Sequence, residues 1–232
     1  MAPEPLDTRV TNGRFVNPDG PAISQLTIHA GEVVADDQSD VWRTVDASGH
    51  FVFPGLIQPG LPAHDAALDL VRGGTTAVHW TGDDVSAACL DVVKSSIDGL
   101  RIVTPATDGS LSDSEWDLLL GDEPAHFSVG EQRAFPVIHF LYHEGHVKRG
   151  MSLERIAAVT SGNLARAAGI YPRKGSFQVG SDGDLFVFDP ETPDPYRDLG
   201  YPGRVIFSLM RGQILLYNGQ IHTSAGDGIT LP

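Results

Sequence analysis

Three histidines that lie close together in the sequence are the first candidates for chemistry. His139, His143 and His146 fall within the segment VIHFLYHEGHVK. On an α-helix, positions i, i+4 and i+7 share one face, so the three imidazoles could approach one zinc ion. The span from i to i+7 is long for direct ligation, and Gly145 is placed to interrupt the helix. A helix face that carries polar residues near its end explains the same spacing, and both interpretations stay open.

Four further side chains lie at or just after the ends of short apolar runs, where strands of a parallel sheet often carry catalytic groups. His64 and Asp65 follow a short apolar run, His79 ends the run TTAVH, and Asp108 ends VTPATD. Each has an ordinary alternative, because Asp65 favours the amino terminus of a helix and a core histidine usually bonds to a neighbour. The single cysteine, Cys89, excludes a disulfide within the chain and is interpreted as a packing residue.

Composition limits the classes of partner. The chain has 232 residues, a formal net charge of −14 and a pI near 4.8, so nucleic acid and anionic membranes would be repelled. No apolar run approaches the ~20 residues of a membrane-spanning helix, and the start MAPEPLDTRV lacks the order of a signal peptide. The sequence therefore predicts a cytoplasmic protein that binds neither nucleic acid nor membrane.

Both ends of the chain are rich in short strands. The pair Asn12-Gly13 between two apolar stretches predicts a hairpin, and turns are expected at Gly180–Asp184, Arg211-Gly212 and Asn218-Gly219. Because both ends show this pattern of short apolar stretches and turns, we expect their strands to pair with each other. The prediction is a discontinuous β-sandwich formed by residues 1–54 and 176–232.

The middle of the chain alternates strands with helices. The patterns predict the helices 62–72, 83–99, 131–147, 152–160 and 163–168, the strands 75–80 and 100–108, and an irregular polar segment 109–130. Units of this kind build parallel sheets. With the short run at 56–57, residues 55–175 are expected to hold three parallel strands.

The carboxyl-terminal half carries a specific resemblance to a known family. The segments GEQRAFPVI and MSLERIAAVTSGNLARAAGIYPRKGSFQVGSDGDLFVFDP cover nearly sixty residues in one register, and VDASGHFVFPGLIQ and VRGGTTAVHW extend the likeness at the front. This pattern resembles the dihydropyrimidinase and D-hydantoinase family of the amidohydrolase superfamily. In that family, a small β-sandwich accompanies a metal-dependent (β/α)8 barrel, and Arg173-Lys174 would lie in the turn that returns to the sandwich.

The resemblance implies that this chain holds only part of the barrel. A complete barrel takes about 250 residues, so both ends align and the centre is missing. The remnant is expected to keep three neighbouring parallel strands in the order 8-1-2. Asp108 would then match the aspartate of the eighth strand, or Ile102 and Val103 would belong to the third strand and Asp108 to a loop. The sequence leaves both assignments open.

The positions that would begin the metal site have lost their ligands. The family motif Asp-x-His-x-His falls on Gln58, Gly60 and Pro62, and glycine and proline offer no ligand atom. Ser128 stands where the resemblance places an asparagine that contacts substrate. His79 would point into the barrel lumen. The resemblance therefore predicts no cofactor, with zinc on the histidines of the segment 137–148 as the alternative.

These losses favour a non-catalytic assembly, regulatory or binding subunit. The resemblance includes a precedent in the collapsin response mediator proteins, which keep the fold and assemble without the metal site. The alternative is a hydrolase that acts on the C–N bonds of a cyclic amide, or on another small molecule, with a rebuilt site. The cut barrel is expected to expose Leu56, Ile57, Val78 and Val103, so a homodimer or a full-length homologue should cover them.

Overall fold

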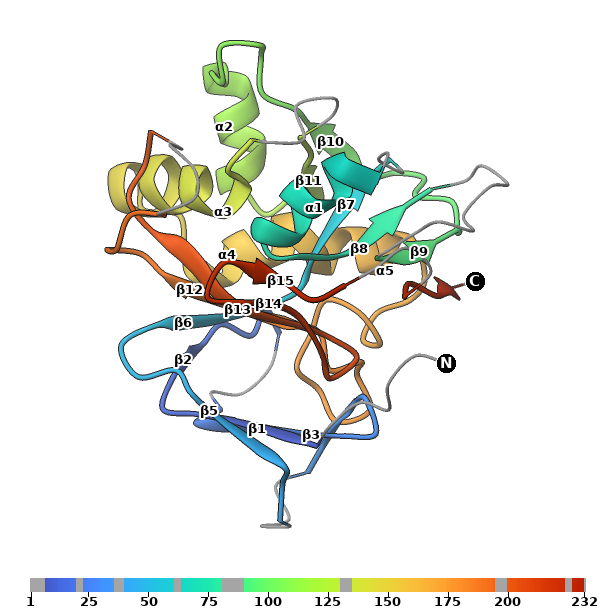
Figure 1. Cartoon of the computed structure of the whole chain (residues 1–232). Helices are drawn as coiled ribbons and strands as arrows, with labels where there is room; N and C mark the ends of the chain where they lie inside the picture. The colour runs from blue at the N-terminus through green and yellow to red at the C-terminus, as the bar shows by residue number, and fades with distance from the viewer. Residues whose placement is uncertain are drawn as a thin grey trace.

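Figure 1 shows the computed structural model of the chain, which describes residues 7–19, 23–35, 40–60, 64–80, 90–129, 135–194, 200–223 and 227–231. The side chains of residues 64–66 lie outside this description. Two sheets form the lower part of the molecule in Figure 1, and a layer of parallel strands and helices forms the upper part. None of the helices among the described residues is long and apolar enough to cross a bilayer.

The two sheets of the lower part combine strands from both ends of the chain. The outer sheet has the order β4-β3-β1-β5, with β1 Thr8–Thr11, β3 Gln25–His29, β4 Glu32–Val34 and β5 Arg43–Asp46. The inner sheet has the order β15-β14-β13-β12-β6-β2, with β2 Arg14–Phe15, β6 Phe51–Pro54, β12 Leu185–Asp189, β13 Arg204–Met210, β14 Gln213–Tyr217 and β15 Gln220–Ile221. Strands β6 and β12 are antiparallel neighbours, so segments more than 130 residues apart share a sheet.

The inner sheet is buried on both of its faces. Along β12, Leu185 and Val187 pack in the apolar core shared with the outer sheet, whereas Phe186 and Phe188 belong to the core shared with the helices. Successive side chains of a strand point to opposite faces, so an uninterrupted apolar run suits a central sheet. The fold is therefore built in layers on both sides of β12.

Two of the predicted turns are confirmed, and each closes a hairpin. Arg211 and Gly212 both have positive φ and connect β13 to β14, and Asn218 and Gly219 do the same between β14 and β15. The hairpin predicted at Asn12 is wrong, because β1 belongs to the outer sheet and β2 to the inner one. Asn12 and Gly13 do form a tight bend, but the two strands that flank the bend pair with strands of different sheets.

The structure has more parallel strands than the three that the sequence predicts. One sheet has the order β16-β9-β8-β7, with β7 Leu56–Pro59, β8 Thr75–His79, β9 Asp91–Val93 and β16 Thr230–Leu231. Residues 83–89 lie outside the described residues, but β9 corrects the helix predicted over 83–99. Two consecutive valines suit a strand, and pairing on both sides overrides the helical periodicity.

A second pair of parallel strands lies in the segment predicted to be irregular. Strand β10, Arg101–Val103, pairs with β11, Ala125–Phe127, and helix α2, Asp113–Leu120, connects them. Ser112 and Glu115 form a complete capping box at the start of α2. The prediction that 109–130 is irregular is therefore wrong, and the spacing of Ser112 and Glu115 in the sequence already indicates a helix start.

The remaining helices cover the parallel strands. They are α1 His64–Arg72, α3 Val137–Phe140, the π-helix η1 Leu141–Val147, α4 Leu153–Ala157, the π-helix η2 Ala158–Gly162 and α5 Asn163–Ala167. The Ser152 hydroxyl accepts a hydrogen bond from the backbone N–H of Arg155 and caps α4, as its sequence position predicts.

The parallel sheet is covered on both faces by its own chain. Leu56, Ile57, Val78 and Val103, which were expected to be exposed, are at most 2% exposed. Leu56 and Val78 belong to the large core that includes side chains of α1, whereas Ile57 packs in a separate cluster with side chains of α5. The retained helices pack on both faces of this sheet, which corrects the expectation that these residues are exposed.

Candidate functional site

Gln58 occupies the position where the family resemblance begins the metal site. It is fully buried at the carboxyl end of β7. Its Nε2 donates to the backbone carbonyl of Phe127 over 3.4 Å, and its Oε1 accepts from the backbone N–H of Val129 over 3.1 Å. Both ends of the amide are thus engaged with the chain at β11. The side chain acts as a bridge between β7 and β11 in place of a backbone ladder.

The next two motif positions offer no ligand. Gly60 has a φ of 95° and donates its backbone N–H to the carbonyl of His79 over 2.8 Å. Pro62 lies outside the described residues, and its ring has no donor atom for a metal. Together with the engaged amide of Gln58, these residues do not fit a binuclear metal centre of the family type.

Two buried histidines lie near the ends of β8 and β11. The Nε2 of His79 lies 2.6 Å from the backbone carbonyl of Ser95, which assigns the ring N–H to that nitrogen. His126 is fully buried, and neither ring nitrogen has hydrogen-bond geometry to a partner among the described residues. Burial lowers the pKa of His126 to about 3, the Ile57 backbone opposes the shift, and charge on His79 would add to it. His126 is therefore a neutral imidazole at ordinary pH.

His126 is a buried candidate that the sequence pattern does not single out. It lies in the segment predicted to be irregular, although a strand through Ala125, His126 and Phe127 would have indicated that its side chain is buried. Ser128, which was considered, follows directly and is also buried. Its backbone N–H donates to the carbonyl of Val103 over 2.8 Å and extends the pairing of β10 with β11.

Asp108 and His64 are not brought into this buried region by any described contact. Asp108 is exposed and accepts hydrogen bonds from the backbone N–H and hydroxyl of Ser110 at 2.9 and 2.7 Å. These bonds hold the pKa of Asp108 below its usual range. His64 begins α1, and its side chain lies outside the described residues.

The three histidines considered as a zinc site do not converge. The Nε2 atoms of His139 and His143 lie 3.0 Å from the carbonyls of Gly203 and Pro202, and Nδ1 of His146 lies 2.7 Å from that of Met151. The segment passes from α3 into the π-helix η1, so the α-helical spacing assumed from the sequence does not apply. The three rings thus contact three different carbonyls, and they are not among the described groups of three possible ligands that lie within 4.8 Å of one another.

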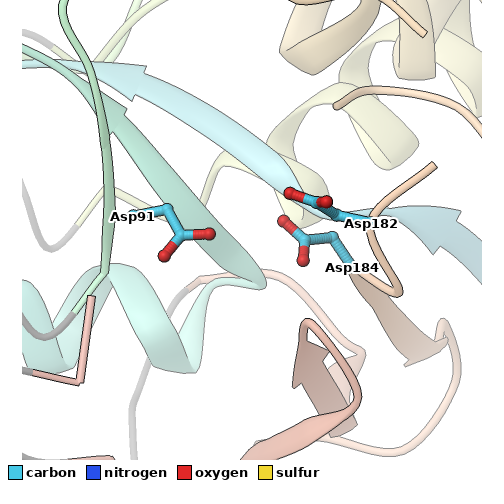
Figure 2. Close-up of side chains that lie close together, drawn as sticks. All are labelled: Asp91, Asp182 and Asp184. Carbon is cyan, nitrogen blue, oxygen red and sulfur yellow. The ribbon is translucent and has the colours of Figure 1, made fainter. Parts of the chain in front are cut away.

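A different cluster brings together three carboxylates. The possible ligand oxygens of Asp91, Asp182 and Asp184 lie within 4.8 Å of one another, and no other such group of three occurs in the described ranges. Figure 2 shows Asp182 and Asp184 side by side, with Asp91 facing them from β9. The Nζ of Lys174 lies 2.6 Å from Asp91 Oδ2, 2.6 Å from Asp184 Oδ2 and 2.9 Å from Asp182 Oδ2. The buried ammonium group therefore already fills the place of a cation.

Further partners complete this network. The Arg211 guanidinium forms an ion pair with Asp91, and Arg173 Nε lies 3.2 Å from Asp182 Oδ1. Asp184 also accepts from the Thr76 hydroxyl over 2.9 Å and from the backbone N–H of Arg211 over 2.8 Å. The cluster thus connects β8 and β9 with the inner sheet of the sandwich. Its geometry is that of a structural joint in which each carboxylate faces a cation.

Comparison with known proteins decides the family. The model of the amidohydrolase family matches residues 121–215. An allantoinase from Deinococcus radiodurans is 27% identical over 175 residues, covering 62% of this chain and 37% of that protein. An L-hydantoinase from Paenarthrobacter aurescens is 30% identical over 95 residues, covering 35% and 21%, and human dihydropyrimidinase-related protein 5 is 29% identical over 106 residues, covering 40% and 19%. The chain belongs to the dihydropyrimidinase and hydantoinase family of amidohydrolases.

Solved structures support the hydantoinase fold. The dihydropyrimidinase of Brevibacillus agri aligns with a TM-score of 0.67 at 14% identity, over 97% of this chain and 98% of that chain. The D-hydantoinase of a Thermus species aligns with the same score at 13% identity and the same coverage. In sequence, this hydantoinase-family chain spans 37% or less of the length of the three relatives described above. The two sheets of the lower part are mixed, the other two are parallel, and the described strands do not close into a barrel.

Proposed function

We propose that this hydantoinase-family chain works by association, as an assembly, regulatory or binding subunit, and not through the metal chemistry of the family. One observation carries the proposal. The amide of Gln58, at the first position of the lost metal motif, bonds to the backbone at Phe127 and Val129 and connects two strands. The aspartate that the family motif has at this position is replaced here by a glutamine whose amide connects two strands.

The same bridge supports a more detailed description of the fold. We propose that β7, β8 and β9 with β10 and β11 are the remnant of a (β/α)8 barrel. In a closed barrel the last strand lies beside the first, and Gln58 holds β11 beside β7. This arrangement favours β11 as the counterpart of the eighth strand, in place of the segment that contains Ile102 and Val103. The limits of the sandwich, 1–54 and 176–232, stay a prediction, and β16 lies within that range but pairs with β9.

Metal content tests the proposed function. Protein purified without chelator should contain well below one zinc, manganese or iron ion per chain by elemental analysis. It should hydrolyse neither dihydrouracil nor hydantoin above background, because metal-activated water is the nucleophile available to a binuclear centre. A D-hydantoinase prepared in parallel is the positive control. Retention of one or two metal ions per chain would overturn the proposal.

A rebuilt hydrolytic site is the second candidate function. It is favoured by His126 and His79, which lie close enough for the charge on one to affect the pKa of the other. A neutral imidazole can accept a proton as a general base, and the lowered pKa of His126 makes it a weaker base than an ordinary histidine. Turnover that survives chelator treatment and disappears in His126→Phe, with folding retained, would establish this function. Loss of activity in Asp108→Ala would instead place the site at the exposed loop.

A further inference from the structure

The segment Asp227–Leu231 crosses from the sandwich to the parallel sheet. In β16, Thr230 and Leu231 align with Val92 and Val93 of β9 in parallel register. The backbone N–H groups of Val92 and Lys94 donate to the carbonyls of Ile229 and Leu231 over 2.8 and 3.2 Å. The end of the chain marked C in Figure 1 accordingly lies beside β9. The segment covers what would otherwise be an open edge of the sheet.

Side chains add two anchors to this pairing. Leu231 is 1% exposed and packs in the apolar cluster that contains Val93. Asp91 Oδ1 accepts from the backbone N–H of Ile229 over 3.0 Å, and the Arg211 guanidinium donates to the carbonyl of Asp227 over 3.0 Å. The contacts are specific, because they require an apolar residue two positions after the N–H that bonds to Asp91.

The attachment is small compared with the rest of the fold. One buried leucine side chain contributes about 1.5–3 kcal/mol, and each backbone hydrogen bond contributes about 1 kcal/mol net. Short edge segments of this kind open well below the free energy of global unfolding. Opening would uncover Val92, Val93 and the backbone groups of β9, and a bare edge of this kind accepts another strand.

We propose that the segment 227–231 is an exchangeable edge strand, and that β9 of one copy accepts the segment of a second copy to form a strand-exchanged dimer. The second copy carries the sequence whose fit to β9 is already established by the contacts within one chain. Exchange preserves every one of these contacts. Its main free-energy cost is therefore the translational and rotational entropy that two chains lose when they associate. The inference deepens the proposed association by naming its surface.

Mixed disulfide formation tests the exchange. Both chains carry Cys89→Ser; one has Val92→Cys and a size tag, and the other has Thr230→Cys without a tag. Because Val92 and Thr230 face each other in the parallel register, the two cysteines can form a disulfide only when the segment of one copy lies on β9 of the other. After joint incubation at high concentration and mild oxidation, a dimer with one tag should appear on a non-reducing gel.

Matched variants separate exchange from chance collisions. Tyr217→Cys, on an exposed position of β14, replaces Thr230→Cys as the control partner and should give no dimer with the Val92→Cys chain. Adding Leu231→Asp to the Thr230→Cys chain should lower the yield of mixed dimer about tenfold or more, because the buried anchor is lost. If Val92→Cys prevents folding, Lys94→Cys with a short bis-maleimide linker replaces it outside the apolar core.

Two results would overturn the exchange. The mixed dimer could stay at the level of the Tyr217→Cys control at every concentration, while a chain with both Val92→Cys and Thr230→Cys forms only an internal disulfide. Alternatively, the wild-type chain could dimerise in light scattering without any mixed disulfide, which would place the association on another surface. Neither result bears on metal content or turnover, so failure of the exchange remains distinguishable from failure of the non-catalytic function.

Discussion

Lys174 is the single residue on which the joint between sandwich and parallel sheet depends most. Its ammonium group is buried among Asp91, Asp182 and Asp184. Lys174→Met should lower the free energy of unfolding by about 3–5 kcal/mol, because buried carboxylates lose their cation. Urea unfolding at pH 7 measures the loss. Arg173→Met is the control, since that partly exposed pair with Asp182 should contribute about 1 kcal/mol or less. Equal effects of the two variants would contradict the assignment of Lys174 as the central cation.

His126 gives the stability a defined dependence on pH. Its pKa is about 3 in the folded chain, against an ordinary value of 6.5. Above pH 6.5 the imidazole is neutral in both states, so His126 contributes no slope. Between pH 6.5 and about 3 only the unfolded state binds the proton, and stability should fall by about 1.4 kcal/mol per pH unit. Urea unfolding from pH 7 to about 5 should show this slope in the wild type and a shallower one in His126→Phe. Parallel curves would show that the ring is accessible to protons in the folded state.

At the scale of secondary structure, the Gln58 bridge holds β11 against β7. Gln58→Leu should cost about 2–3 kcal/mol, because the buried carbonyl of Phe127 and N–H of Val129 lose their partners. Hydrogen exchange at the Val129 amide should accelerate more than exchange in β12. Gln220→Leu, on the exposed face of β15, is the matched control and should stay within about 0.5 kcal/mol of the wild type. Unchanged protection at Val129 would show that backbone contacts alone align these strands.

At the scale of the whole molecule, the chain covers its own parallel sheet. Freshly diluted protein should therefore scatter light as a monomer of 24.8 kDa and should not bind a hydrophobic dye. Concentrated protein should convert slowly to the strand-exchanged dimer, because exchange requires the segment 227–231 to open first. An obligate dimer at every dilution would instead indicate that the two chains share a large interface.

The sequence by itself predicted the family, the absence of ligand atoms at Gly60 and Pro62, and the local signals that act over a few residues. The hairpins at Arg211-Gly212 and Asn218-Gly219 and the cap at Ser152 depend on backbone conformations that those residues favour locally. The missing ligands at Gly60 and Pro62 follow from residue type alone. No tertiary contact was needed for any of these conclusions.

The tertiary structure decided which strands pair and which groups meet. Asp91–Val93 became a strand because β8 and β16 flank it, and Asn12-Gly13 became a crossing between sheets because β2 pairs with β6. Lys174 meets Asp91 across 83 positions of sequence, and Gln58 meets Val129 across 71. Burial and long-range pairing outweigh local preferences of less than about 1 kcal/mol per residue. Those contacts form only in the folded chain, so local sequence patterns do not predict them.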